Sequence, residues 1–148
     1  MTITLDPSSF GWGILGVILI VGLLFLFWVW RFIARYGRAS NGDRAEVRER
    51  WKRVEALSNA NDESTLRHAV IEADNVFDLG MKLKFFAGKD FGGRLKHATA
   101  QYRTLRTIWG PHKLRNQLVH ETGTRLSTYQ AKRAIAVYRD GLKELGLL

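Results

Sequence analysis

The longest uncharged segment of the chain sets the first limit on its fold. No charged residue lies between Trp12 and Trp30, and the apolar run continues past one arginine to Ile33. About 22 residues of α-helix rise roughly 33 Å, enough to cross the hydrocarbon core of a bilayer. Tryptophans stand at both ends of the run, where their rings prefer the headgroup layer. We therefore predict a transmembrane helix over residues 12–36, with residues 12–33 in the membrane.

The charges on either side of this segment predict its orientation. Arginines follow it at four positions within residues 31–44, whereas the only charged residue before it is Asp6. Cytoplasmic flanks of membrane helices are enriched in basic residues, so residues 1–11 should lie outside and the remainder in the cytoplasm. The run has no basic leader and no small-residue cleavage site. We expect an uncleaved, single-pass anchor in the inner (cytoplasmic) membrane.

Charge is distributed unevenly over the rest of the chain. Residues 43–78 carry six Lys and Arg against nine Asp and Glu, whereas residues 79–148 carry fourteen against four. Such a basic half favours an anionic partner, either RNA or an acidic lipid surface, although it can also serve only as a solvated face. The chain has no cysteine, which excludes disulfides and thiolate metal sites.

Helical spacing dominates the part of the chain that follows the apolar run. Residues 37–60 combine a breaker-rich linker with a charged helix whose apolar stripe is Val47, Trp51 and Val54, and this helix is either a stalk or a docked outer helix. Residues 61–148 then show four helical patterns, separated by glycines, a Gly-Pro pair and a capping box. Their ranges are 61–84, 91–109, 111–121 and 127–145. The predicted fold is all-α, an up-down bundle of four to five helices.

Within the pattern over residues 91–109, two aromatic residues fall on the stripe of apolar residues that recurs every three or four positions. Because of this spacing, we expect Tyr102 and Trp109 to lie in the core.

The pattern over residues 111–121 contains the most chemically suggestive segment, RNQLVH at residues 115–120. The guanidinium of Arg115 can hold phosphate oxygens, and the imidazole of His120 can move the proton of a ribose 2′-hydroxyl. Asn116 lies four residues before His120, on the same helix face. Arg115 and His120 are five residues apart, about 140° around a helix, so one copy would not direct both at one phosphate. Two copies that meet in a dimer could.

This segment resembles the Arg-x(4–6)-His motif of the HEPN superfamily, in which a polar residue usually follows the arginine. The resemblance covers about residues 61–146. It implies a helical bundle that forms a homodimer through the motif-bearing face and acts as a metal-independent endoribonuclease. Arg115, Asn116 and His120 would then be catalytic, and the products would carry cyclic 2′,3′-phosphates. We expect no cofactor and no metal ion.

Further basic residues could track an RNA backbone beside the motif. They are Lys82, Lys84, Lys89, Arg94, Lys96, Arg103, Arg106, His112 and Lys113. His112 either lines the same cleft or is a structural residue of the first turn.

Three other assignments are left open by the sequence. Glu72 and Asp74 interrupt an apolar helix and either orient the cationic site or are solvated. For Arg115 and His120, the non-catalytic alternative is a salt-bridged surface cation and a surface histidine at a helix end. In the second functional hypothesis the bundle is a non-catalytic module that binds RNA, a nucleotide or a partner protein at the membrane.

Overall fold

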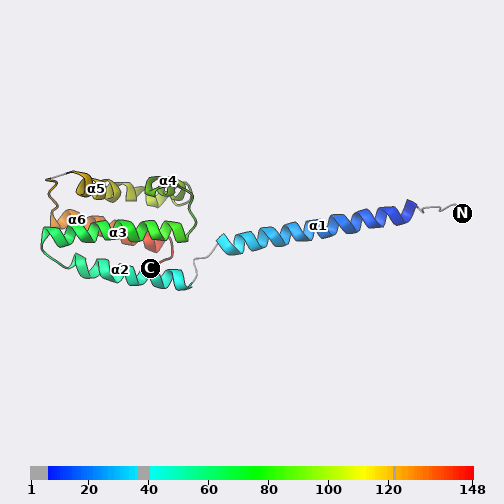
Figure 1. Cartoon of the computed structure of the whole chain (residues 1–148), viewed down its shortest axis with the longest axis horizontal. Coiled ribbons are helices and arrows are strands. Elements are labelled where there is room, and N and C mark those ends of the chain that lie inside the picture. The colour runs from blue at the N-terminus through cyan, green and yellow to red at the C-terminus, as the bar shows by residue number, and fades with distance from the viewer. Residues whose placement is uncertain (1–6, 37–40, 122) are drawn as a thin grey trace. The chain divides into compact units, whose positions relative to one another are not determined.

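The structure, a computed structural model, describes residues 7–36, 41–121 and 123–148, without the side chains of residues 7–15 and 32–36. The chain divides into two compact units, residues 1–38 and 39–148 (Figure 1). All regular structure in the described residues is helical, which confirms the predicted all-α class.

The first unit contains one long helix, α1, over Pro7–Tyr36. Among the described residues, we find no helix that is both long enough and apolar enough to cross a membrane. The transmembrane helix predicted over residues 12–36 therefore stays a prediction.

The second unit begins with α2, Asn41–Ser58, which is docked against the bundle. Val47 and Val54 are fully buried and Trp51 nearly so, and α2 packs on both α3 and α6. Of the two roles predicted for this segment, the docked outer helix is therefore the one observed. The helical unit accordingly starts before residue 61.

Four more α-helices and one short 3-10 helix complete this unit. Their bounds are α3 Glu63–Leu83, α4 Phe91–Gln101, η1 Arg103–Ile108, α5 Trp109–His120 and α6 Thr128–Glu144. Three helices begin where a side chain accepts a hydrogen bond from the first turn: Asp62 before α3, Asp90 before α4 and Ser127 before α6. The capping box of Ser127 and Gln130 is confirmed.

The helix predicted over residues 91–109 is wrong in its second half. Instead of continuing over 91–109, it ends at Tyr102, whose backbone is extended (φ −121°, ψ 94°), and η1 follows. The extended residue resets the helical phase, so Leu105 and Ile108 are buried while Trp109 is 42% exposed. Tyr102 itself is only partly buried against the core. The prediction that Trp109 belongs to the core is therefore wrong.

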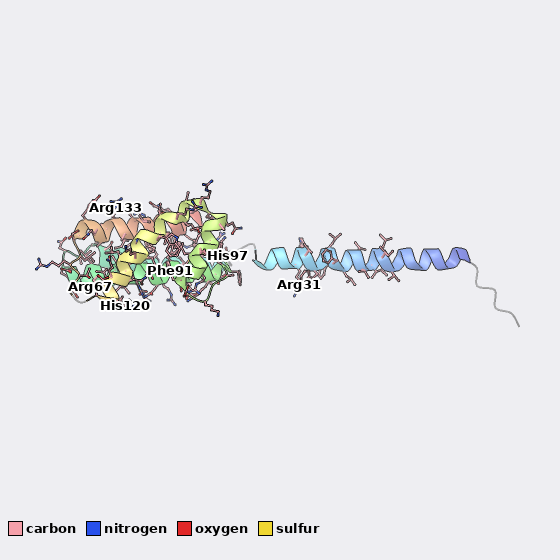
Figure 2. The ribbon with its side chains drawn as sticks, turned by 90° about the horizontal axis from the view of Figure 1, so that it is seen from above. Arg31, Arg67, Phe91, His97, His120 and Arg133 are labelled. Carbon is pink, nitrogen blue, oxygen red and sulfur yellow. The ribbon has the colours of Figure 1, made fainter. Side chains whose placement is uncertain are left out.

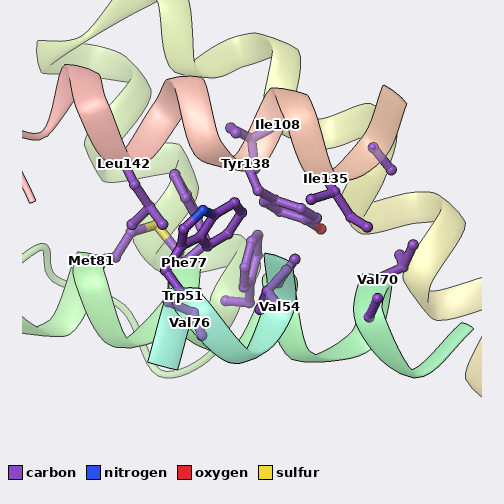
Figure 3. Packing of buried hydrophobic residues seen from close by; sticks show 14 of the residues in the cluster. Trp51, Val54, Val70, Val76, Phe77, Met81, Ile108, Ile135, Tyr138 and Leu142 are labelled. Atoms are coloured by element: carbon purple, nitrogen blue, oxygen red, sulfur yellow. The ribbon is translucent and has the colours of Figure 1, made fainter. Parts of the chain in front are cut away.

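The core lies between α3 and α6 and is closed by α2 on one side and by α4, η1 and α5 on the other (Figures 1 and 3). Phe77 of α3 lies at its centre, with ring centroids 5.7 Å from Tyr138 and 6.0 Å from Phe91. Gly141 permits this approach, because a Cβ atom there would lie 2.7 Å from the Phe77 ring.

Candidate functional site

A buried carboxylate lies in the middle of α3. Asp74 is 3% exposed, although its neighbours on the same helix face are apolar. Its Oδ1 atom accepts a hydrogen bond of 2.8 Å from Nδ1 of His112 on α5 and one of 2.6 Å from the hydroxyl of Tyr138 on α6. A buried charge is tolerated only where it is hydrogen-bonded or paired. Asp74 thereby links α3, α5 and α6. The sequence left open whether Asp74 is solvated or orients the cationic site, and the solvated alternative is wrong because the residue is buried.

The pKa of Tyr138 agrees with its role as a hydrogen-bond donor to Asp74. Burial raises the pKa of Tyr138 far above its usual value, and the negative charge of Asp74 and the hydrogen bond to it raise the pKa further. The phenol therefore keeps its proton and donates it toward Asp74. The nearby cation Arg115 opposes the shift but does not cancel it.

His112 continues the network away from Asp74. Because a carboxylate only accepts, we assign the ring proton to Nδ1 of His112. Nε2 of the neutral ring then accepts from the amide nitrogen of Asn116, 3.3 Å away. The imidazole stacks on Phe91 with centroids 3.8 Å apart and planes within 3°. His112 thus has a structural role in the first turn of α5, where its ring is held by Asp74, Asn116 and Phe91.

Arg115 ends the network. Its Nε atom lies 3.5 Å from Oδ2 of Asp74, and its Nη1 donates a 3.1 Å hydrogen bond to Oδ1 of Asn116. The side chain is 25% exposed, and Nη2 makes no hydrogen bond to any residue that the structure describes. The guanidinium is therefore held from behind, by Asp74 and Asn116, with one nitrogen available to an anion.

His120 lies at the other end of the same helix. It is the last residue of α5, it is exposed, and among the described residues it has no hydrogen-bond or ionic partner. Arg67 of α3 fixes this end by donating to the carbonyl oxygens of Leu118, at 2.9 Å, and Thr124, at 2.6 Å. Figure 2 labels Arg67 and His120 at this end of the bundle. The exposed His120 stands two residues beyond the carbonyl that Arg67 holds.

The contacts of α3 with α5 show that the two helices run antiparallel. Arg67 meets Leu118, whereas Asp74, further along α3, meets His112, earlier on α5. Residues after Asp74 on α3 therefore lead away from His120. The separation along α3 from Arg67 to Lys82 is about 22 Å.

Four of the predicted RNA-binding residues do not share a surface with the motif: Lys82, Lys84, Lys89 and Arg94. Lys82 pairs with Asp78 at 2.7 Å, and Lys84 and Lys89 lie beyond it, at the end of the bundle remote from His120. Arg94 is buried and makes two hydrogen bonds of 2.8 Å to Asp78, so it joins α4 to α3 and is not available to RNA.

The other predicted contacts are more accessible. Lys96 is exposed on α4, Arg103 and Arg106 are exposed on η1, and Lys113 is exposed on α5. Glu72 is half-buried on α3 and accepts a 3.4 Å hydrogen bond from Asn75, so it takes no part in the network around Asp74. We find no metal-binding group of three or more acids and histidines in the parts of the chain that the structure describes.

Two features of the site were not predicted from the sequence. They are the hydrogen bonds that Arg67 donates to the end of α5 and the hydrogen bond between Tyr138 and Asp74. Tyr138 was expected only as a core residue of α6, and its hydroxyl partner lies 64 residues earlier. The one available signal was the acid in the apolar stripe of α3, since a buried carboxylate requires donors.

Comparisons with protein-family models, with curated proteins and with solved structures gave no match to this chain. The HEPN resemblance therefore stays a prediction.

Proposed function

We propose that this chain is a membrane-anchored, HEPN-like endoribonuclease that cleaves RNA without a metal ion. The observation that carries the proposal is the arrangement on α5. A guanidinium held from behind, Arg115, shares this short helix with an exposed histidine, His120, that has no partner among the described residues.

The chemistry assigns a role to each residue. Nη2 of Arg115 would bind the scissile phosphate and stabilise the charge that develops on it. His120 would act as general base or acid for the ribose 2′-hydroxyl. Asn116 and Asp74 position Arg115 and would not touch the RNA. Attack by the 2′-hydroxyl leaves a cyclic 2′,3′-phosphate and a 5′-hydroxyl.

The helix geometry favours a homodimer for this reaction. Arg115 and His120 point about 140° apart around α5, so a complete site needs Arg115 of one copy and His120 of the other. Val119, an exposed large apolar residue beside His120, suits burial in such a contact.

The test is cleavage of single-stranded RNA by the full chain in detergent and EDTA, with the product ends identified. His120→Ala and Arg115→Lys should each lower the rate by about a hundredfold or more, because general acid-base and charge-stabilising groups contribute at this level. His97→Ala and Arg125→Ala alter exposed residues of the same types and serve as matched controls. Equal cleavage by all variants, or none by folded wild-type protein, would refute the proposal.

A non-catalytic binding module is the second candidate, and one observation favours it. The exposed Lys89 and the half-buried Lys84 lie at the end of the bundle remote from His120. In that case RNA binding would fall on charge reversal of Lys84 or Lys89 and would be unaffected by His120→Ala.

The anchor belongs to the same proposal. Between Val17 and Trp30, α1 exposes twelve large apolar side chains, and contiguous exposed apolar surface of this kind marks a membrane or protein contact. We propose that α1 holds the chain in the inner membrane with the bundle in the cytoplasm. Resistance to alkaline extraction from membranes would support this, and release into the soluble fraction would refute it.

A further inference from the structure

Trp109, the first residue of α5, keeps its ring at the surface of the bundle. It is 42% exposed, and its Nε1 atom makes no hydrogen bond to any residue that the structure describes. The ring is nevertheless held in place. Its centroid lies 6.4 Å from that of His112 at an interplanar angle of 70°, and a Cβ atom at Gly92 of α4 would lie 3.6 Å from its Cη2 atom. A large aromatic ring that is both fixed and accessible can stack with a flat ligand.

Trp109 shares one face of α5 with His120. Lys113, Asn116 and His120 follow Trp109 at steps of four, three and four residues, which places all four within about 60° of the helix circumference. The two buried side chains of α5 lie on the opposite face. Lys113 and His120 are exposed, and Asn116 is partly buried. This stripe, the outer face of α5, extends roughly 16 Å along the helix from Trp109 to His120.

The charges around the outer face of α5 favour an anionic ligand. Residues 91–120 form α4, η1 and α5 on one side of the core (Figure 1), and they contain six Lys and Arg but no Asp or Glu. Two of the six, Arg94 and Arg115, pair with acids of α3. The acids that border this stretch, Asp90 and Glu121, accept hydrogen bonds from nearby residues. The remaining cations are exposed and form no ion pair with any described residue: Lys96, Arg103, Arg106 and Lys113.

Single-stranded RNA fits these features better than a second protein chain does. An exposed ring can stack on a base only where that base is unpaired, and cations beside the ring suit the phosphates of the same strand. At about 3.4 Å per stacked nucleotide, no more than about five nucleotides cover the distance from Trp109 to His120. A second copy of this chain is less favoured on this face, because two identical cationic faces repel each other.

We propose that Trp109 stacks on a base of single-stranded RNA that lies along the outer face of α5, with Lys113 on a phosphate and His120 at the scissile bond. The inference deepens the proposed ribonuclease, because the stacked base would lie within about five nucleotides of the cleaved bond. It rests on that function for the position of the cleaved bond. Stacking itself is a binding property, which RNA that cannot be cleaved reveals.

Binding is measured with the full chain in detergent, by fluorescence anisotropy of a labelled single-stranded 2′-O-methyl RNA that lacks the attacking hydroxyl. Trp109→Ala should weaken binding by about tenfold or more, because one base–aromatic stack contributes at this level. Trp109→Phe keeps a ring and should retain most of the affinity. Tyr129→Ala removes a ring of α6 that is 72% exposed and is the matched control, with unchanged affinity expected. The melting temperature of each variant shows whether the fold is retained.

Removal of single bases locates the stack. The substrate is a DNA strand with one ribonucleotide, so that cleavage is confined to one bond, and each nearby base is replaced in turn by an abasic site. With the wild type, one replacement within about five nucleotides of the ribonucleotide should slow cleavage by about tenfold. With Trp109→Ala the same replacement should have little further effect, because the ring that stacked on that base is absent. An equal response of both proteins at every position overturns the inference.

The outcomes distinguish the stacking site from the ribonuclease. Tighter RNA binding by the wild type than by Trp109→Ala, without any cleavage, supports the stacking site and refutes the proposed function. Equal affinities of the wild type, Trp109→Ala and Tyr129→Ala overturn the inference, whether or not RNA is cleaved. If Trp109→Ala changes the oligomeric state in light scattering but not the RNA affinity, the face is a contact between copies of the chain and the inference is overturned. Absence of binding by folded wild-type protein overturns both proposals.

Discussion

The Asp74 carboxylate receives donors from α5 and α6, so its removal leaves several polar groups without an acceptor. We expect Asp74→Ala to lower the free energy of unfolding by about 3 kcal/mol or more, because the buried donors of His112 and Tyr138 both lose their acceptor. Tyr138→Phe removes one donor only and should cost about 1 kcal/mol. Urea denaturation measures both, with Asp140→Ala, on the surface, as the control. Equal effects of the three variants would contradict the proposed role of Asp74.

Phe85 follows the end of α3 and Gly146 follows the end of α6, in equivalent positions of two helix caps and with left-handed φ angles of 58° and 67°, which makes a reciprocal exchange informative. Phe85→Gly relieves the left-handed strain but makes the unfolded chain more flexible and removes the contacts of the half-covered ring, so it should not stabilise the chain by more than about 1 kcal/mol. Gly146→Phe introduces the strain and should destabilise by about 1 kcal/mol. Thermal denaturation distinguishes the two. Marked destabilisation by Phe85→Gly would mean that the ring serves the fold.

Gly141 lies where α6 packs closely against its neighbours. A Cβ atom there would lie 2.7 Å from Phe77 and 2.9 Å from Ile108, whereas one at Gly110 of α5 would meet nothing within 4 Å. Gly141→Ala should therefore destabilise the bundle by about 1–3 kcal/mol. Gly110→Ala should change the stability by less than about 1 kcal/mol, because the helix preference of alanine is offset by the clash between its Cβ and the ring of Pro111. Calorimetry should show a clear fall in melting temperature for Gly141→Ala alone, and equal shifts for the two variants would refute the packing.

The start of α3 depends on the charge of Asp62. Its pKa is lowered from 3.8, chiefly by the hydrogen bond that it accepts from the Thr65 amide. A lowered folded-state pKa means that the cap contributes fully above about pH 3.8 and is lost as the pH falls through the folded value. Asp62→Ala should thus be less stable than the wild type at neutral pH, and the difference should shrink below pH 3.8.

Asp62→Asn is the control for this titration. Its amide oxygen caps the helix without titrating, so its stability relative to Asp62→Ala should not depend on pH in that range. The measurement is the denaturation midpoint against pH. A difference between wild type and Asp62→Ala that persists unchanged into strong acid would refute the assignment.

The helices could be predicted from the sequence where side chains mark their ends. Ser127 with Gln130 began α6 as expected, and glycines separated α3 from α4. The break at Tyr102 could not be predicted, because neither glycine nor proline marks it and tertiary packing decides the local backbone. In the candidate site, Arg115 could be found by its motif. Its link to Asp74 and Tyr138 depends on the relative register of three helices, which no local pattern specifies.

At the scale of the whole chain, the protein consists of two compact units, residues 1–38 and residues 39–148. Residues 39–148 contain the buried core, so this segment should fold by itself with a single cooperative transition in urea. Circular dichroism and tryptophan fluorescence should give the same midpoint. Residues 61–148, which lack α2, should be destabilised by several kcal/mol because Val47, Trp51 and Val54 no longer cover α3. Equal stability of the two segments would contradict the docking of α2.

Two residues of α3, Arg67 and Asp74, fix α5 at different points along its length, and this affects how a ligand would bind to α5. Asp74 contacts His112 in the first turn of α5 and Arg115 near its middle, and Arg67 donates a hydrogen bond to the Leu118 carbonyl in its last turn. A helix of twelve residues with only two buried side chains would ordinarily fray. Fixed at both ends, its amide protons should instead exchange with solvent about as slowly as those of α3. Whatever binds there would meet a surface already in its final shape and would lose little entropy in ordering it.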